Sequence, residues 1–335
     1  MTREPLLSVR NLKTYFHQDE GTVLAVDGVS FDVMPGATLG IVGESGCGKS
    51  VTARSILRIV DRPGRIVEGE IHFRRRANGG PATTVDLATL DPNGAEMRAI
   101  RGAEIALIFQ EPMSSFSPVH TIGNQIVEAI LLHQAVTPRQ ARGQAIEILA
   151  RVGMPRPRQV VDAYPHQLSG GQRQRAMIAM ALSCKPTLLI ADEPTTALDV
   201  TTQTQILELM RQLQREDGMA IMLITHDLGV IAEMATDVAV MYLGRVVEQA
   251  PVDAIFHDPR HPYTRALLQS IPRIRSRTRE RLTPIAGSVP HPYDRPTGCP
   301  FHPRCANFMP GKCDREAPVL RPVADYHAVS CFLYE

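Results

Sequence analysis

Short apolar runs alternate with amphipathic stretches along most of the chain. The apolar runs are rich in β-branched and aliphatic residues and have the length of a strand, so they predict buried strands. Ile206, Leu209, Met210 and Leu213 follow i, i+3, i+4, i+7 spacing, which predicts one apolar face of a helix. Strands that alternate with helices predict an α/β fold with a largely parallel sheet. The predicted strands are 24–33 (LAVDGVSFDV), 38–45 (TLGIVGES), 105–110 (IALIFQ), 187–194 (TLLIADEP) and 220–227 (AIMLITHD).

Three segments depart from this alternation. Residues Arg74–Gly94 contain Gly, Pro and Asn at short intervals, which predicts a loop or hairpin insertion. Residues 121–165 have a helical composition without a strand signal, which predicts a helical insert. After Pro251 the chain becomes dense in proline. We therefore expect one large domain over residues 1–250 and an extension over residues 251–335.

Composition and charge indicate a globular protein without a strong overall field. Of 335 residues 44% are hydrophobic, and the formal net charge is +1. A charge this small gives no general attraction to nucleic acid or anionic lipid. No apolar run is long enough to span a bilayer, and the opening residues MTREPLLSVRNLKTYF lack the pattern of a signal peptide. We expect a cytosolic protein whose thiols stay reduced.

The run GESGCGKS follows a predicted strand and precedes a helical pattern. It fits G-x-x-x-x-G-K-[ST], in which backbone N–H groups surround phosphate oxygens at the start of a helix. Lys49 would reach the β- and γ-phosphates, and Ser50 would bind Mg²⁺. Cys47 stands at a position that the motif leaves free, and we expect its alkylation to block hydrolysis. The predicted nucleotide contacts here are Gly43, Glu44, Ser45, Gly46, Cys47, Gly48, Lys49, Ser50 and Val51.

A second chemical signal ends the apolar strand LLIADE. Asp192 at the end of this strand suits Mg²⁺, bound directly or through water. Glu193 follows it and would act as the general base that polarises the attacking water. Together with the phosphate loop, these carboxylates predict hydrolysis of a nucleoside triphosphate.

The motif LSGGQ, Leu168–Gln172, makes the prediction more specific, because it resembles the signature of ABC-type ATPases. Gln110 resembles the Q-loop residue, Asp199 the D-loop residue and His226 the switch histidine of that family. Phe16 resembles the aromatic residue that stacks on adenine. The resemblance covers about residues 6–249. It implies a P-loop, RecA-like ABC ATPase core with an antiparallel β subdomain and a helical insert.

The same resemblance implies roles for these residues. Lys49, Gln110, Glu193 and His226 would form the catalytic set, with Gln110 also near Mg²⁺. Phe16 would stack on adenine, although a core role for it or for the adjacent Tyr15 stays open. Ser169 is a good N-cap, and the helix N-terminus after it suits an anionic phosphate. The signature residues, which would bind the γ-phosphate of a partner subunit's ATP, are Ser169, Gly170, Gly171 and Gln172.

The extension narrows the family. The stretches HDPRHPYTRALLQSIP and GSVPHPYDRPTGCPFHPRC resemble the C-terminal extension of the ATPases of dipeptide, oligopeptide and nickel importers, and the chain is most similar to their dipeptide D-type subunits. This implies an ATPase that powers peptide import from the cytoplasmic face of the inner membrane. The implied partners are a related F-type ATPase, two permeases and an extracytoplasmic binding protein, with no nucleic acid.

Cys299, Cys305, Cys313 and Cys331 give the extension a C-x₅-C-x₇-C-x₁₇-C spacing. In a cytosolic protein such a group favours metal binding over disulfides. The resemblance implies a [4Fe–4S] cluster. Zn²⁺, with His302 and His327 as spare ligands, and a metal-free tail remain alternatives.

A rival from another class is a DNA-repair ABC ATPase whose metal-bound cysteines grip nucleic acid. The basic runs Arg74–Arg76 and Arg273–Leu282 raise it, although they also suit a solvated surface. Salt-sensitive DNA binding would support this rival. Within the importer class, nickel is an alternative cargo to peptides.

Overall fold

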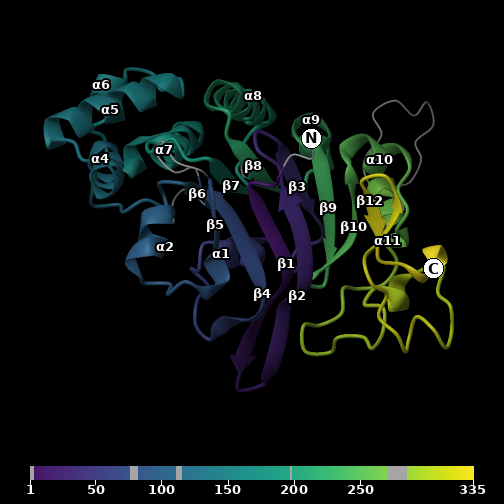
Figure 1. The fold of residues 1–335 in the computed structure, drawn as a ribbon. Coiled ribbons are helices and arrows are strands. Elements are labelled where there is room, and N and C mark those ends of the chain that lie inside the picture. The colour runs from purple at the N-terminus through teal and green to yellow at the C-terminus, as the bar shows by residue number, and fades with distance from the viewer. Residues whose placement is uncertain (1–3, 76–81, 111–114, 197, 271–284) are drawn as a thin grey trace, which may run out of the picture.

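The computed structural model describes residues 4–75, 82–110, 115–196, 198–270 and 285–335 (Figure 1). These residues form a central sheet, a second antiparallel sheet, and helices around both. The helices are α1 Lys49–Ile56, α2 Ala95–Ile100, α4 Ile122–His133, α5 Pro138–Arg151, α6 Pro157–Val160, α7 Gly170–Leu182, α8 Val200–Asp217, α9 Leu228–Met234, α10 Val252–His257 and α11 Pro262–Gln269.

The central sheet has the order β11-β12-β10-β9-β3-β8-β7-β6. The ladders among β9, β3, β8, β7 and β6 are parallel, which confirms the predicted α/β fold. Successive residues of a strand point to opposite faces, so Leu188 and Ile190 enter one apolar core and Leu189 and Ala191 enter the other. The strands are β3 Thr38–Val42, β6 Ile105–Ile108, β7 Leu188–Asp192, β8 Ala220–Ile224, β9 Asp237–Tyr242, β10 Arg245–Pro251, β11 Arg321–Ala324 and β12 His327–Val329.

The second sheet is antiparallel and has the order β2-β1-β4-β5. Its strands are β1 Leu7–Gln18, β2 Gly21–Val33, β4 Gly64–Arg75 and β5 Thr83–Asp86. The pairing of β4 with β5 gives the predicted insertion a hairpin form, although residues 76–81 lie outside the described part. Helix α1 contacts β1, β2 and β7, so it lies between the two sheets.

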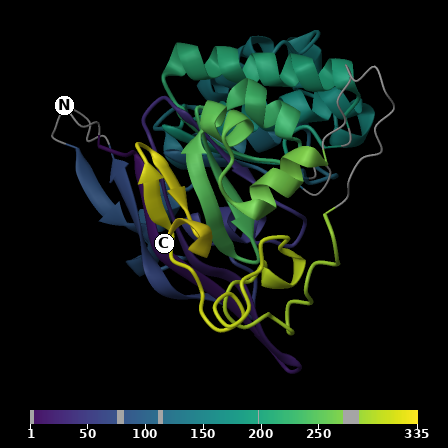
Figure 2. The ribbon, with the colours of Figure 1, turned by 90° about the vertical axis from the view of Figure 1, so that its right-hand side faces the viewer.

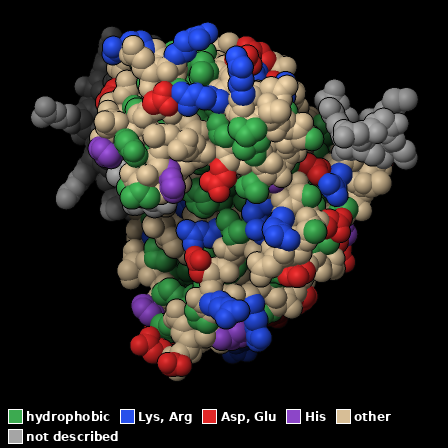
Figure 3. Space-filling model, turned by 90° about the vertical axis from the view of Figure 1, so that its left-hand side faces the viewer, with side chains coloured by type: hydrophobic (Ala, Val, Ile, Leu, Met, Phe, Trp, Pro, Cys, Tyr) green, Lys and Arg blue, Asp and Glu red, His purple; other side chains and the backbone are tan. Residues whose placement is uncertain are grey.

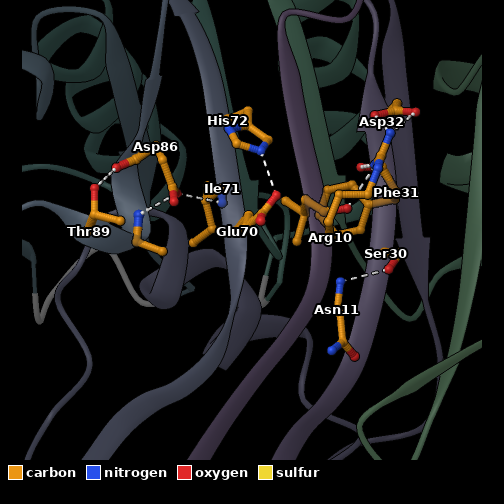
Figure 4. A network of polar contacts seen from close by, with 12 residues as sticks. Arg10, Asn11, Ser30, Phe31, Asp32, Glu70, Ile71, His72, Asp86 and Thr89 are labelled. Atoms are coloured by element: carbon orange, nitrogen blue, oxygen red, sulfur yellow. Dashed lines mark hydrogen bonds and ion pairs between the residues drawn. The ribbon is translucent and has the colours of Figure 1, made fainter.

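Polar contacts cross the second sheet (Figure 4). Arg10 donates from Nη2 to both carboxylate oxygens of Asp32, at 2.8 and 2.9 Å. Asp86 Oδ1 accepts the Ile71 N–H at 2.8 Å and the Ala88 N–H at 3.0 Å, which closes the end of β5. These bonds fix the outer part of the sheet, whereas the apolar core fixes its inner face.

Residues 121–165 form α4, α5 and α6 and contain no strand. Thr121 caps α4 through the Asn124 N–H, and Thr137 with Gln140 forms a capping box at the start of α5. Helices α4 and α5 both contact α7. The predicted helix in 206–213 is part of α8, where Ile206, Met210 and Leu213 are fully buried.

The extension continues the core rather than standing apart from it. Its strand β12 pairs with β10, and β11 pairs with β12, so its last residues extend the central sheet (Figure 2). Cys299, Phe301, Cys313 and Phe332 belong to the same buried cluster as the residues of α7 and α8. In the described residues, no helix is both long enough and apolar enough to cross a membrane.

Candidate nucleotide site

The loop between β3 and α1 has the shape of a phosphate cradle. Gly48 has a φ of 98°, and a Cβ there would lie 2.1 Å from the Ala25 carbonyl oxygen. A Cβ at Gly43 would lie 2.2 Å from the Met241 carbonyl oxygen. Only glycine fits these two positions, because the loop closes against neighbouring backbone. Lys49 follows Gly48 at the start of α1, where the helix N-terminus favours an anion.

Lys49 is buried and folds back over its own loop. Its ammonium donates to the Gly43 carbonyl at 2.7 Å and to the Glu44 carbonyl at 3.2 Å. Its Nζ also lies 3.8 Å from the Sγ of Cys47. Burial raises the pKa of Cys47 above its ordinary value, although Lys49 opposes that shift. Cys47 is therefore a packed thiol beside the cradle, only 3% exposed.

Asp192 lies deep in the site at the end of β7. Burial raises its pKa, while a hydrogen bond with Ser50 lowers it and the charge of Glu193 raises it. Its Oδ1 is buried without a hydrogen-bond partner in the described part of the chain. A buried carboxylate oxygen in that state, beside a hydroxyl, fits a hard cation such as Mg²⁺, which prefers oxygen ligands. Ser50 and Asp192 therefore have the oxygen donors that Mg²⁺ needs.

Two predicted catalytic side chains, Gln110 and His226, contact the carboxylate of Glu193. Its Oε2 accepts from Gln110 Nε2 at 3.1 Å and from Thr196 Oγ1 at 2.8 Å, and its Oε1 lies 3.2 Å from His226 Nδ1. Burial raises the pKa of Glu193, but the bonds from Thr196 and His226 outweigh it, so the net shift is downward. Gln110 and His226, which lie 83 and 33 positions from Glu193 in the chain, thus both contact its carboxylate.

A cavity of 210 Å³ runs from this carboxylate along the cradle. Residues 45–51 line it together with Gln110 and Glu193. Val23, Leu24 and Ala25 of β2 line its side together with Leu243 and Gly244. The remaining lining residues are His291, Pro292 and Arg295 of the extension.

Phe16 is absent from this lining, as is Tyr15. Phe16 is half-buried beside Gly64, where an added Cβ would lie 2.5 Å from its Cε1. Tyr15 instead donates its hydroxyl to Asp27 at 2.8 Å, and burial together with that bond raises the pKa of Tyr15 to about 12. Stacking of Phe16 on adenine stays a prediction.

The signature residues lie apart from the cavity lining. Ser169 is the N-cap of α7 and forms a capping box with Gln172. Gly171 approaches α8 so closely that a Cβ there would lie 2.8 Å from Thr202 Cγ2. Asp199 caps α8 by accepting the Thr202 N–H at 3.0 Å, and bonds from Thr202 lower the pKa of Asp199. The helix N-terminus of α7, with Gly170 in its first turn, therefore lies beside the D-loop residue.

The four cysteines of the extension are all free thiols. Burial raises the pKa of Cys299 to about 11, and the other three thiols add to the shift. Burial also raises the pKa of Cys305 and Cys331, each with a contribution from Cys313. Within the described residues, no three His, Cys, Asp or Glu side chains are arranged to hold a single metal ion.

The two histidines expected as spare zinc ligands have other partners. His327 Nε2 lies 2.8 Å from the buried carboxylate of Glu248, and His302 Nδ1 lies 3.0 Å from the Cys299 carbonyl oxygen. Since one zinc ion would need ligands at about 2.3 Å from a common centre, the described side chains do not fit zinc.

The sequence reasoning missed how the extension contacts the phosphate loop. Arg304 donates to both carboxylate oxygens of Glu44, at 2.7 and 3.0 Å. The hydroxyl of Tyr263 accepts the Glu44 N–H at 2.9 Å. A signal was present in the sequence, because the pattern H-P-Y-x-R occurs twice, at 261–265 and 291–295. The first copy contacts the phosphate loop, and the second copy lines the cavity.

Known protein families match both parts of the chain. A family model described as "ABC transporter" matches residues 26–196, and one described as "Oligopeptide/dipeptide transporter, C-terminal region" matches residues 247–313. A putative peptide import ATP-binding protein of Brucella melitensis is 49% identical over all of this chain and 99% of its own length. The dipeptide transport ATP-binding protein DppD of Escherichia coli is 48% identical over 97% of this chain and 96% of its own length.

Further relatives extend the comparison to oligopeptides and to solved structures. The oligopeptide transport ATP-binding protein AppD of Bacillus subtilis is 49% identical over 98% of this chain and 97% of its own length. A dimeric bacterial ABC transporter cassette has a TM-score of 0.63 at 27% identity, covering 73% of this chain and 98% of its own. Clostridium perfringens cbiO1, part of an ABC transporter complex, has a TM-score of 0.61 at 25% identity, covering 76% of this chain and 92% of its own.

Proposed function

The chain belongs to the family of ABC transporter ATP-binding subunits that power peptide import, and from this premise we propose how its cavity hydrolyses ATP. Glu193 is the general base for the attacking water, and Gln110 and His226 hold its carboxylate in place. The observation that carries the proposal is the bonding of all three side chains at one end of the phosphate loop. The lowered pKa of Glu193 keeps the carboxylate ionised at neutral pH, as a general base requires.

The phosphates occupy the cradle of residues 43–51. Lys49 releases its loop carbonyls and donates to the β- and γ-phosphates, which are stronger acceptors because they are charged. Ser50, Asp192 and Gln110 hold Mg²⁺, and the orphaned Asp192 Oδ1 supports this assignment. When bound, Mg²⁺ would supply positive charge that stabilises the charge of the phosphates.

The second half of the catalytic site comes from another subunit. Ser169–Gln172 at the start of α7 present a capped helix N-terminus that lies outside this chain's own cavity lining. Such a terminus binds an anionic γ-phosphate across a dimer. We assign the partner to a related F-type ATPase, with Asp199 beside the shared face. The dimeric cassette among the similar structures supports this arrangement.

The transporter around this pair contains two permeases and an extracytoplasmic peptide-binding protein. The helical insert, α4 to α6, and the Gln110 segment pass closure of the ATPase pair to the permeases on the cytoplasmic face of the membrane. ATP drives the motion because it binds the closed pair more tightly than the open pair. Dipeptides and oligopeptides are the cargo, since a dipeptide transport protein and an oligopeptide transport protein both match nearly the full chain. No relative reported above supports the nickel alternative.

The charged side chains that the structure describes do not favour the nucleic-acid rival. On the face in Figure 3, Lys and Arg side chains are interspersed with Asp and Glu. Arg142 pairs with Asp162, and Arg151 pairs with Glu216 and Asp217. Arg75 of the first basic run pairs with Glu104, and Arg273–Leu282 lie outside the described residues. A salt-bridged, mixed surface does not favour DNA.

The four thiols of the extension form a candidate site for an iron–sulfur cluster. The Cys299 N–H donates to the Cys313 carbonyl at 2.8 Å, which brings these two residues together, and the charges of neighbouring thiols add to the raised pKa of Cys299, Cys305 and Cys331. A cluster carries a separate iron for each thiolate, so its ligands need not meet at one ion. Its role is to crosslink a segment that has few core residues of its own.

Anaerobic purification followed by visible spectroscopy and analysis of iron, sulfide and zinc tests the cluster. About four irons per chain, lost on Cys305→Ser, are expected for the cubane cluster. Protein without iron would remove the cluster from the proposal and leave a packed thiol group.

The general base is tested by Glu193→Gln in the presence of the partner ATPase. The variant should bind ATP and hold the dimer together while releasing phosphate at least about 100-fold more slowly, as expected for loss of a general base. Glu208→Gln, on the exposed face of α8, is the matched control and should turn over normally. Phosphate release by Glu193→Gln at the unmodified rate would refute the assignment.

A further inference from the structure

The residues that line the nucleotide cavity form two chemically distinct groups. The phosphate cradle, Gln110 and Glu193 are the groups that act on the γ-phosphate. The other group consists of Val23, Leu24 and Ala25 of β2, the pair Leu243 and Gly244, and three residues of the extension. A nucleotide with its phosphates in the cradle has this second group left for its ribose and base.

We propose that His291, Pro292 and Arg295 of the extension form the wall that binds the nucleoside part of ATP. The cassette fold alone would leave this side to β2. Here a segment that begins at His291, 266 positions after Ala25, lines the same cavity, so the extension is a part of the ATP site. The proposal deepens the ATPase assignment and rests on it.

Arg295 is firmly placed at this wall. Its Nη1 lies 2.9 Å from Asp27 Oδ2, and the same carboxylate is 2.8 Å from Arg245 Nη2. Tyr15 donates its hydroxyl to the other oxygen of Asp27 at 2.8 Å. The Arg295 side chain is only 17% exposed, and its Nη2 is buried without a hydrogen-bond partner among the described residues. Arg295 lines the cavity, and a small rotation of its guanidinium would direct this spare donor at a ribose hydroxyl or a ring nitrogen of the base.

His291 and Pro292 are exposed and are therefore free to contact a ligand. Their backbone is held by Tyr293, whose hydroxyl bonds to Gln18 Oε1 and whose ring covers Gly21 in the turn between β1 and β2. In Figure 1 this part of the extension runs beside the lower end of β1 and β2. The His291 and Tyr293 rings lie 5.3 Å apart, and the Tyr293 N–H is directed to His291 Nδ1 at 3.4 Å.

The two H-P-Y-x-R segments make comparable turns. In the first, the Tyr263 N–H donates to His261 Nδ1 at 3.0 Å, as Tyr293 does to His291 in the second. The first histidine is buried and structural, whereas the second is exposed at the cavity. The same local turn therefore supports the phosphate loop in one copy and presents an aromatic ring and a proline face in the other. Flat apolar faces and a fixed cation are the chemistry that binds a heteroaromatic base.

Binding measurements on the full chain can separate the nucleoside from the phosphates. Isothermal titration calorimetry in the presence of Mg²⁺ compares the affinities for ATP and ADP with the affinity for inorganic tripolyphosphate, which can contact only the cradle. We expect His291→Ala and Arg295→Lys each to weaken ATP and ADP by about 5- to 10-fold, the range of one lost contact. Tripolyphosphate affinity should stay unchanged. In the assembled transporter KM for ATP should rise with kcat preserved.

Matched controls are available in the same extension. His257→Ala and Arg315→Lys change exposed residues outside the cavity lining and should leave all three affinities unaltered. The inference is overturned if ATP affinity stays within twofold in both cavity variants, or if tripolyphosphate weakens equally. If the unmodified chain binds tripolyphosphate and ATP equally well, the nucleoside wall is refuted while ATP binding stands. If it binds neither, the ATPase assignment itself fails.

Discussion

Arg304 offers a direct measure of how strongly the extension holds the phosphate loop. Its guanidinium makes two parallel hydrogen bonds to Glu44, and Nε donates to the Ala286 carbonyl at 3.0 Å. The Arg304 side chain is 4% exposed and that of Glu44 is 25% exposed. The hydrogen bonds to Glu44 raise the pKa of Arg304 above its ordinary value, despite its burial. Arg304→Met keeps most of the side-chain volume and removes the charge.

The expected cost follows from the burial of the two partners. Breaking a fully buried ion pair by removing one partner costs about 3–5 kcal/mol, because the other charge is left uncompensated. Glu44 retains partial access to water, so we expect a loss of about 2–3 kcal/mol in the free energy of unfolding. The coupling energy between Arg304→Met and Glu44→Gln in a double-mutant cycle should be about 2 kcal/mol.

Urea unfolding followed by circular dichroism measures both quantities. Arg10→Met is the matched control, because Arg10 also contacts both oxygens of one carboxylate but is 45% exposed. That surface pair should contribute less than about 1 kcal/mol. The reasoning fails if the two substitutions cost the same, or if the coupling energy between Arg304 and Glu44 is below about 0.5 kcal/mol.

Three further predictions follow from the site. Cys47 should react with iodoacetamide far more slowly than a free thiol at pH 8, and faster as pH rises, because burial raises its pKa. Once Cys47 is modified, the chain should not hydrolyse ATP. Peptide mapping measures the modification, and phosphate release measures the hydrolysis. His226→Ala should move the acid limb of the hydrolysis profile to higher pH, since it removes a bond that lowers the pKa of Glu193; an unmoved limb contradicts this. Burial lowers the pKa of His261 to about 3, so below pH 6.5 the unfolded chain binds a proton that the folded chain does not bind. As pH decreases below 6.5, the free energy of unfolding should therefore fall by up to about 1.4 kcal/mol per pH unit. His261→Gln should flatten that slope in urea titrations between pH 5 and 7, and an equal slope in both proteins would show that another group causes it.

Local patterns predicted strands and nucleotide motifs because each of those signals lies within a few neighbouring positions. The five apolar runs all contain strands, four of them in the central sheet and one, β2, in the antiparallel sheet, and the periodic face of α8 is buried. Strand β1 escaped prediction because its register shifts between Val9 and Leu12, so apolar residues do not keep a period of two. The pairing of Glu44 with Arg304 joins residues 260 positions apart, and no local pattern encodes that contact.

The roles of Phe16 and of the four thiols depend on ligands that are not part of the chain. Stacking needs a base, and the fate of the four cysteines depends on whether iron is supplied during folding. The sequence therefore identified chemically suitable residues, whereas their final geometry depends on the ligand.

The pairing of β12 with β10 has a practical consequence for trimming the protein. Cutting the chain near residue 250, where a plain cassette would stop, would leave β10 as an open sheet edge, which invites aggregation with other chains. It would also remove the partners of Glu248, a fully buried carboxylate. These are the backbone N–H groups of Arg260 and His261 and the side chain of His327. A shortened version should therefore be insoluble rather than merely inactive, and the tail must be retained in any recombinant design.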